Sequence, residues 1–492
     1  MGTARSEAGR TVTTSIPARL DQLPWSRWHW SIIIGLGTVW ILDGMEVTIV
    51  GNVAGRLSEP GSGLPITSGE VTGIAAALYV AGACSGALFW GRLTDIYGRK
   101  KLFLITLAVY LGATALTALA FETWWFFLFR FLTGFGIGGE YAAINSAIDE
   151  LIPAYYRGRV NLVINGSYWL GAVGGSLLSI VALDTSIFPA NVGWRLTFAL
   201  GAVLALVILL VRRHVPESPR WLLIHGREEE AERIVNGVEQ QVMAETDKPL
   251  PRAEGQMTIH QRRRTTFTEI ARTVFAQYRR RSTLSFALFV GQAFLYNAIT
   301  FGYGAILIQF FDVPSGHTGY YFAVIAAGNF LGPLLLGKLF DTVGRRIMIS
   351  GTYLLSGVLL FGTAWLFDQG SLNASTMTAC WCVVLFFAST GASSAYLTVS
   401  EIFPMETRAM AIAFFYAIGT ATGGISGPLI FADLTNTGVV GDTVLAFQIG
   451  AGLMCAAGIV AAFLAVNAER RSLEDIATPL SVTKSEGEAS GA

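Results

Sequence analysis

Long apolar stretches alternate with short polar segments over most of this chain. Most of the stretches are 20 residues or longer, about the length an α-helix needs to cross the hydrocarbon core of a bilayer. The pattern predicts twelve transmembrane helices, at 28–50, 69–90, 101–120, 124–146, 161–183, 194–212, 283–310, 318–337, 347–367, 376–399, 409–431 and 443–467. We therefore expect an all-α membrane protein.

Composition supports this prediction, because 52% of the residues are hydrophobic and only 14% are charged. Soluble domains carry about a quarter charged residues, and a soluble chain of this composition would expose large apolar patches. The polar segment before Pro24 lacks the short apolar core and cleavage site of a secretory signal, so we interpret the first apolar stretch as an uncleaved helix. The four cysteines fall in apolar stretches, which is typical of small buried hydrophobic residues.

Basic residues test the helix count independently, because Arg-rich and Lys-rich loops stay cytoplasmic during membrane insertion. With the N-terminus inside, only Arg56 falls in an outer loop, while Arg130 lies within a predicted helix and Arg195 at the start of one. Every other Arg and Lys lies in a tail or at an inner loop. This distribution predicts twelve spans with both termini in the cytoplasm.

The segment 213–282 is the one long polar stretch between predicted helices. Within it, Glu228–Arg233 predicts a short charged surface helix. Two basic clusters follow, Arg262–Arg264 and Arg279–Arg281. They favour an inner linker that obeys the topology rule, with contact to anionic lipid headgroups as the alternative.

Two motifs repeat at the spacing of six helices. The stretch 91–100, GRLTDIYGRK, returns 246 residues later as GKLFDTVGRR. Glu150, Pro153 and Arg157 return 251 residues later as Glu401, Pro404 and Arg408. The chain therefore divides into a tail, a six-helix half, a central loop, a second six-helix half and a tail, at 1–27, 28–212, 213–282, 283–467 and 468–492. Parallel halves of this kind place a binding site between them near the bilayer midplane.

The doubled motif resembles the signature of the major facilitator superfamily, whose architecture it implies for residues 28–467. Its glycines allow close helix contact, and its aspartates can accept hydrogen bonds from helix N-termini and arginines. The resemblance implies that such networks close the cytoplasmic side; fixing the topology alone is the alternative. The candidate gate residues are Gly91, Arg92, Asp95, Gly98, Arg99, Glu150, Arg157, Glu217, Arg220, Asp341, Arg345, Glu401 and Arg408.

Four ionisable residues lie well inside predicted helices: Asp43, Glu46, Arg130 and Glu140. Each costs about 2.5–3.5 kcal/mol to insert, so each is a candidate for function. Asp43 and Glu46 lie three apart on one helix face, and two nearby carboxylates resist double ionisation. We therefore expect these residues to handle a proton.

Arg130 and Glu46 lie at similar depths below the outer ends of their helices. A carboxylate that pairs with Arg130 when ionised and leaves it when protonated would be a two-state switch. The alternatives are a fixed structural ion pair, or an Arg130 that binds a substrate carboxylate directly, which would favour an anion. Glu140 follows a glycine-rich stretch deeper on the same helix as Arg130. It is either an inner proton relay or a helix anchor.

Several fragments resemble the sugar porter family, namely 216–221 (PESPRW), 157–159 (RGR), 401–404 (EIFP) and 472–476 (SLEDI). By this resemblance, Glu46 and Arg130 carry proton coupling, Gln292 and Asn297 bind substrate, and Asn165 replaces a substrate-binding glutamine. The expected cavity residues are Asn165, Tyr168, Gln292, Tyr296, Asn297, Tyr303, Asn329, Ser394, Tyr396 and Tyr416. For each one, a helix–helix hydrogen bond or an interfacial ring is the alternative.

The chain also departs from that family. Its tenth predicted helix has Ala392–Tyr396 (ASSAY) where the family has a proline and a tryptophan, and Tyr303 stands in place of a double tyrosine. Asp43–Glu46 (DGME) is similar to a motif of aromatic acid:proton symporters, and Gly138–Tyr141 (GGEY) to a stretch in other metabolite:proton symporters.

We therefore expect a carrier in the cell membrane, not an enzyme, that moves a sugar-like compound or an organic or aromatic acid together with protons. The expected partners are a small-molecule substrate, protons and the lipid bilayer, with no nucleic acid. We expect a monomer with no cofactor, no metal and no catalytic residues, driven by the proton gradient. A proton-coupled exporter of drugs or metabolites is the alternative. A membrane sensor or an enzyme is disfavoured, because the sequence shows no convincing signalling domain and no nucleophile motif.

Overall fold

The structure, a computed structural model, describes residues 11–67, 70–212, 216–246, 256–260, 271–314, 317–435 and 437–478, with the single residues 250, 268 and 480. Twelve helices in this part of the chain are 20 to 33 residues long, and each overlaps one predicted segment. They are α2 (Arg27–Leu57), α3 (Ala76–Tyr97), α4 (Arg99–Ala118), α5 (Thr123–Leu151), α6 (Arg157–Ala182), α7 (Ala190–Arg212), α11 (Arg279–Phe311), α12 (Thr318–Thr342), α13 (Arg345–Asp368), α14 (Ala374–Ile402), α15 (Arg408–Thr435) and α16 (Val440–Leu464).

Eight of these helices are long and apolar enough to cross a membrane by length and composition alone, namely α2, α4 and α11 to α16. Polar residues lower the hydropathy of helix α5, which is not among the eight. Helix α5 carries Arg130, Glu140, Asp149 and Glu150, all of them buried. Such residues lower the mean hydropathy of a helix while lying against other helices and away from lipid.

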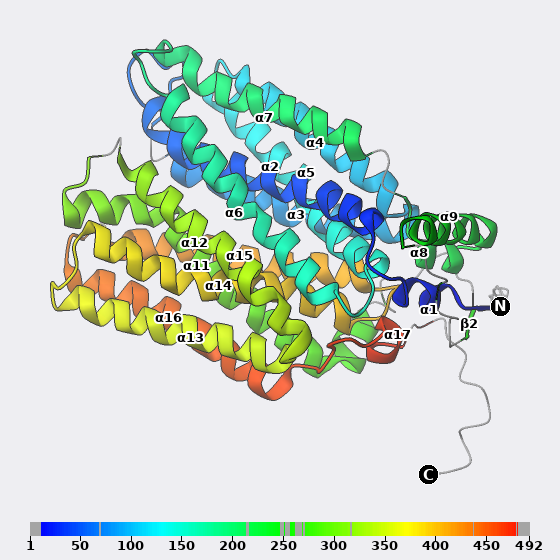
Figure 1. The fold of residues 1–492 in the computed structure, drawn as a ribbon. Coiled ribbons are helices and arrows are strands. Elements are labelled where there is room, and N and C mark those ends of the chain that lie inside the picture. The colour runs from blue at the N-terminus through cyan, green and yellow to red at the C-terminus, as the bar shows by residue number, and fades with distance from the viewer. Residues whose placement is uncertain are drawn as a thin grey trace, which may run out of the picture.

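The two halves repeat the same helix pairing. In the first half α2 packs on α6, α3 on α5 and α4 on α7; in the second half α11 packs on α15, α12 on α14 and α13 on α16. The halves meet through α6 with α12 and through α3 with α15. Figure 1 shows the first half, in blue to green, lying alongside the second, in green to orange. This arrangement leaves the midplane space between the halves for a site.

Short elements cover one end of the bundle. They are α1 (Ile16–Asp21), α8 (Pro219–Ile224), α9 (Glu228–Thr246) and α17 (Leu473–Ile476), with the one-turn π-helix η2 (Arg272–Gln277) leading into α11. Figure 1 shows α1, α8, α9 and α17 together at this end, which we call the capped end. A second π-helix, η1 (Glu70–Ala75), precedes α3 at the opposite end.

The capped end differs from the prediction in two respects. The charged helix expected at Glu228–Arg233 extends to Thr246, and Arg19 of α1 donates to Glu239 at 2.5 Å and to Glu232 at 2.7 Å. An antiparallel pair of strands, β1 (Thr11–Thr14) and β2 (Met257–His260), joins the tail to the central loop, so the fold is not purely helical. Four-residue strands carry too little alternation to be predicted. The basic cluster at 262–264 lies outside the described residues.

The turn formed by the repeated motif requires its second glycine. Gly98 and Gly344 adopt φ values of +97° and +116°, a region that residues with a side chain rarely occupy. Each stands between two helices, α3 and α4 or α12 and α13, and lets the chain reverse within one residue. The motif is therefore a tight turn that delivers the arginine after it to the start of the next helix.

Helix α2 approaches α6 so closely that Gly171 has no room for a side chain. A Cβ atom at Gly171 would overlap the carbonyl of Ile41, whereas one at Gly174, a turn away, meets nothing. We therefore expect Gly171→Ala to destabilise the protein by about 1–3 kcal/mol through overpacking. Gly174→Ala is the matched control and should be neutral or slightly stabilising. Thermal unfolding of the purified variants measures both, and equal melting temperatures would contradict the close packing.

Candidate functional site

A cavity of about 170 Å³ lies between the two halves. Helices α2, α3, α5 and α6 line it from the first half, and α11, α14 and α15 line it from the second. Seven of the ten residues expected in the cavity belong to this lining, namely Tyr416 and six others. The six are Asn165, Tyr168, Gln292, Tyr296, Asn297 and Tyr396.

Three residues expected in the cavity are absent from its lining. Tyr303 is buried beside α14, where its hydroxyl pairs with Thr378 at 2.6 Å, so the prediction of a cavity role for Tyr303 needs correction. Asn329 lies behind the wall and accepts a hydrogen bond from the Tyr296 hydroxyl at 3.0 Å. Ser394 bonds the backbone of its own helix at 2.6 Å. Helix rotation, which spacing alone does not define, decides each of these positions.

Four aromatic residues in the lining were missed: Trp40, Tyr79, Tyr141 and Trp169. Tyr141 and Trp40 carried a usable signal, because Tyr141 follows Glu140 and Trp40 lies three residues before Asp43. Aromatic residues are common throughout membrane helices, so composition by itself did not separate these four from lipid-facing rings.

The predicted charge pair forms inside the first half. Arg130 on α5 donates to Glu46 on α2, and each residue is only 1% exposed. The guanidinium also lies 4.8 Å from the ring centre of Tyr79. Removing one partner from such a buried pair leaves an uncompensated charge, which costs about 3–5 kcal/mol.

Asp43 has different partners from Glu46. Its carboxylate accepts hydrogen bonds from the hydroxyls of Tyr79, at 3.1 Å, and Tyr141. Both tyrosines line the cavity, so Asp43 is one side chain behind its wall. Glu140 is buried on α5 and is not part of the lining.

Aromatic rings from both halves meet at the edge of the cavity that faces the capped end. Trp40 and Tyr141 stack with their centres 4.7 Å apart, Tyr141 meets Tyr416 edge-on at 4.6 Å, and Tyr396 packs against Trp40 at 5.6 Å. Tyr396 and Tyr416 lie six and eight residues from the capped-end termini of α14 and α15. These four residues, which we call the ring cluster, form part of the cavity wall on the side of the capped end.

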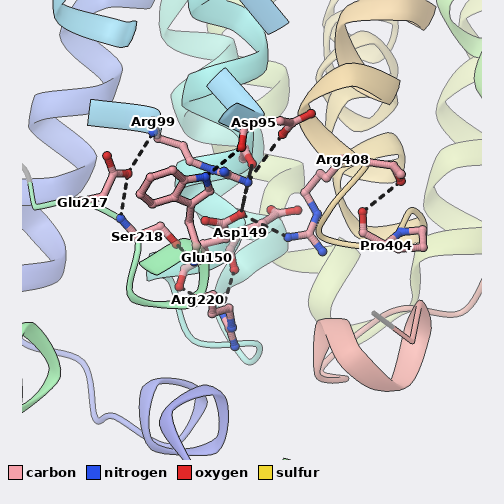
Figure 2. A network of polar contacts seen from close by, with 12 residues as sticks. Asp95, Arg99, Asp149, Glu150, Glu217, Ser218, Arg220, Pro404 and Arg408 are labelled. Atoms are coloured by element: carbon pink, nitrogen blue, oxygen red, sulfur yellow. Dashed lines mark hydrogen bonds and ion pairs between the residues drawn. The ribbon is translucent and has the colours of Figure 1, made fainter. Parts of the chain in front are cut away.

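An ion network joins the halves at the capped end, as Figure 2 shows around Arg99, Glu150 and Arg408. Arg99 contacts Glu150 at 2.9 Å and Asp95 at 3.9 Å, and Arg408 of the second half lies 3.6 Å from Glu150. Glu150 thus links α4, within its own half, to α15 of the other half.

Arg99, Glu150 and Asp95 form a triad in the first half, and the second half contains its equivalent. Arg345 contacts Glu401 with two hydrogen bonds of 2.9 Å and Asp341 at 3.0 Å. Asp341 also accepts hydrogen bonds from the backbone N–H groups of Gly158, at 3.1 Å, and Arg159, at 2.8 Å. The aspartate of the second motif therefore binds the N-terminus of α6 in the first half.

Two further arginines tie the short elements to the network. Arg220 of α8 contacts Asp21 at 3.1 Å and Glu474 of α17 at 3.1 Å. Arg157 also contacts Asp21 at 3.1 Å and donates to the backbone of Arg471 at 3.2 Å. Sequence reasoning missed Asp21, which lies in a polar tail without a motif around it.

The other candidate gate residues also lie at the capped end. Glu217 accepts a hydrogen bond from the backbone of Arg99 at 2.9 Å (Figure 2). It accepts another from the backbone of Lys100 at 3.2 Å. Burial raises the pKa of its carboxyl, while these donors oppose the rise. A Cβ at Gly91 would lie 2.6 Å from Ala413 of α15, so this glycine allows the halves to touch. Arg92 is half-buried on α3.

The described residues contain no group of three His, Cys, Asp or Glu placed to hold a metal ion. The chemical groups around the cavity are amides, hydroxyls and aromatic rings, with buried carboxylates and one guanidinium behind them. This arrangement can hold a small polar compound and change protonation next to it.

Comparison with known proteins agrees with this architecture. The family model described as "Sugar (and other) transporter" matches residues 66–480. The niacin transporter NiaP of Acinetobacter baylyi is 26% identical over 84% of this chain and 89% of its own length. The 4-hydroxybenzoate transporter PcaK of Pseudomonas putida is 23% identical over 95% of this chain and 100% of its own.

Among solved structures, the proton:xylose symporter XylE has a similar fold, with a TM-score of 0.73 at 17% identity over 92% of this chain and 98% of that one. The matched family model covers most of the chain, including both copies of the repeated motif. The chain therefore belongs to the sugar (and other) transporter family of the major facilitator superfamily, and is a multi-pass membrane transporter of small molecules rather than an enzyme.

Proposed function

We propose that the chain is a proton-coupled symporter that takes up a small polar metabolite by alternating access. The twelve long helices cross the cell membrane twelve times, with the capped end and both tails in the cytoplasm. The carrier works as a monomer without a cofactor, and the proton gradient supplies the driving force. The observation that carries this proposal is the pair of buried carboxylates, Asp43 and Glu46, directly behind the wall of a cavity between the halves.

The charge distribution supports the proposed orientation. Arg99, Arg157, Arg220, Arg345 and Arg408 all lie at the capped end, where they make the contacts described above. Positive residues are retained on the cytoplasmic side of membrane proteins. The opposite end of the bundle then faces the outside.

In this mechanism Glu46 and Arg130 form the proton switch. The ionised Glu46 carboxylate stabilises the buried guanidinium, and protonation removes that attraction. The arginine then gains by moving toward other acceptors or water, so the free energy of the local helix arrangement depends on the proton.

Asp43 couples the same half to the cavity. Tyr141 donates to Asp43 and belongs to the ring cluster on the capped-end side of the cavity. Protonation of Asp43 weakens the hydrogen bond that it accepts from Tyr141, because hydrogen bonds to an ionised carboxylate are stronger, and this loosens the position of Tyr141. The ring cluster is therefore the inner gate of the substrate, and Asp43 sets how firmly it closes.

The ion network at the capped end forms a second layer of the inner gate, beyond the ring cluster. Opening toward the cytoplasm requires the contacts from Glu150 to Arg408 and from Asp341 to Gly158 and Arg159 to break, since these connect the two halves. Both triads keep their internal pairs during such a movement. Each half then moves as a rigid body around the cavity.

Uptake by the purified chain in proteoliposomes tests the proposal. Vesicles hold a pH-sensitive dye and an inward proton gradient, and sugars, polyols, aromatic acids and neutral ring compounds are offered in turn. We expect one class to acidify the lumen and to accumulate above its outside concentration. Uptake that stops at equal concentrations, or accumulation without proton entry, would contradict proton symport.

The opposite direction of transport gives a different result. In inverted membrane vesicles with an acidic lumen, where protons are driven outward, a proton-exchanging exporter accumulates its substrate, whereas the proposed symporter expels it. Comparing inverted with right-side-out vesicles therefore separates symport from export by proton exchange.

A further inference from the structure

We propose that the cavity selects a substrate that is uncharged when bound, built on one six-membered ring and carrying both a hydrogen-bond donor and an acceptor. The indole N–H of Trp40 and the carboxamide oxygen of Asn165 hold that donor–acceptor edge. This proposal rests on the transport function above and narrows its substrate class.

Asn165 presents an acceptor to the cavity. Its side-chain nitrogen donates to the backbone carbonyl of Asn161 at 2.8 Å and lies 3.0 Å from the side-chain oxygen of Asn145. A backbone carbonyl can only accept, so the nitrogen of Asn165 must face it and the oxygen must face the other way. That oxygen is buried without a partner among the described residues, although Asn165 lines the cavity and is only 5% exposed.

Trp40 presents the complementary donor. It also lines the cavity, it is 5% exposed, and its Nε1 has no hydrogen-bond partner in the described part of the chain. The indole nitrogen can only donate. Buried Trp N–H groups usually have a partner, and leaving one unsatisfied is costly. Trp40 on α2 and Asn165 on α6 belong to helices that pack together, so one ligand can satisfy both.

The charges near the cavity disfavour an anion. No Arg, Lys or His is among the described lining residues. The guanidinium behind the wall, that of Arg130, is already bound by Glu46, and two lining tyrosines donate to Asp43. With both carboxyls ionised, these three groups carry one net negative charge. A carboxylate ligand would be buried without a cation, which is strongly unfavourable.

The size and shape of the cavity favour a flat ring. An apolar cavity of about 150 Å³ holds benzene, and this one measures about 170 Å³. Its walls include Tyr168, Trp169 and Tyr296, and the rings of Trp169 and Tyr296 approach to 5.3 Å from opposite halves. Aromatic rings of this arrangement stack on a planar ligand. One ring with small substituents fits this space.

Equilibrium binding to the full chain in lipid nanodiscs, with no proton gradient, tests the proposal. The probes are three matched pairs at neutral pH, each a neutral compound and its acid: benzamide and benzoate, nicotinamide and nicotinate, uracil and orotate. We expect at least one neutral member to bind about tenfold or more tightly than its anion. Equal binding of the pair, tighter binding of the anions, or no binding by any neutral compound would overturn the proposal.

Two further changes test the donor–acceptor edge itself. N,N-dimethylbenzamide lacks the donor for Asn165 and should bind more weakly than benzamide. Trp40→Phe keeps a ring but loses the N–H, and should weaken the neutral probe about 3- to 10-fold. Trp365→Phe, on the exposed face of α13, is the control and should bind as the unaltered chain does. A melting temperature for each variant separates lost binding from lost folding.

These outcomes are distinguishable from failure of the transport proposal. Proton-driven uptake of an anion in the proteoliposome screen, combined with tight binding of that anion, would leave the symporter intact and overturn the neutral-substrate proposal. Binding of a neutral ring without any proton-driven uptake would support the neutral-substrate proposal and contradict the symporter. Full binding of the neutral probe by Trp40→Phe would remove the indole N–H from substrate recognition.

Discussion

Glu46→Gln is expected to abolish concentrative uptake, lowering accumulation under a proton gradient by at least about 100-fold, while substrate exchange across the membrane continues. Glutamine keeps the size and a hydrogen-bonding oxygen for Arg130 but cannot change its protonation. The proton switch is then locked in a state that resembles protonated Glu46. Exchange needs only the movement of loaded carrier, which does not require proton release.

Glu59→Gln is the matched control for this prediction. Glu59 also pairs with an arginine, Arg56, but that pair is exposed at the end of α2 far from the cavity. Exposed ion pairs contribute about 0–1 kcal/mol, so uptake by this variant should equal that of the unaltered chain. Normal uphill transport by Glu46→Gln would show that the proton is carried elsewhere, with Asp43 as the next candidate.

Arg345→Met should cause the largest loss of stability, about 3–5 kcal/mol. Arg345 is 1% exposed and satisfies two carboxylates, Glu401 and Asp341. Its removal leaves both of them buried without a cation. Because Asp341 also binds the N-terminus of α6, the contact between the halves should weaken as well. The loss of stability is measured by thermal unfolding in detergent. The weaker contact between the halves is measured by the accessibility of a cysteine introduced at the capped end.

The neighbouring Arg346 provides the control, because it is exposed and donates to a single backbone carbonyl, that of Ala462. Arg346→Met should change the melting temperature by a degree or two at most. The triple variant with Asp341→Asn and Glu401→Gln removes the unpaired charges and should recover part of the lost stability. Equal melting temperatures for the Arg345 and Arg346 variants would contradict the role given to the triad.

Much of the architecture was predictable because its determinants are local. Each residue contributes its own free energy of transfer from water to lipid, regardless of its neighbours. The apolar stretches of the sequence therefore predicted the positions of all twelve long helices. The doubled motif located the turns, and Gly98 and Gly344 have the positive φ that such turns need. Matching depths along two helices were enough to pair Glu46 with Arg130.

The candidate site was only partly predictable. Polar residues inside apolar helices pointed to Asn165 and Gln292, which line the cavity. The same reasoning misplaced Tyr303, and it overlooked Tyr79 and Tyr141, which hold Asp43. Whether a residue on a helix faces a cavity, a neighbouring helix or lipid depends on rotation by a fraction of a turn.

The sequence by itself determined the membrane class, the helix count, the duplicated halves and the residues whose charge is costly inside a bilayer. Only the tertiary structure decided which tyrosines hold Asp43, which rings from the two halves meet in the cavity wall, and that Asp21 joins Arg157 to Arg220. The physical reason is the scale of the free energies involved. Transfer from water to lipid is a large term that each residue contributes alone, whereas contacts between helices are small differences that exist only once distant segments have packed together.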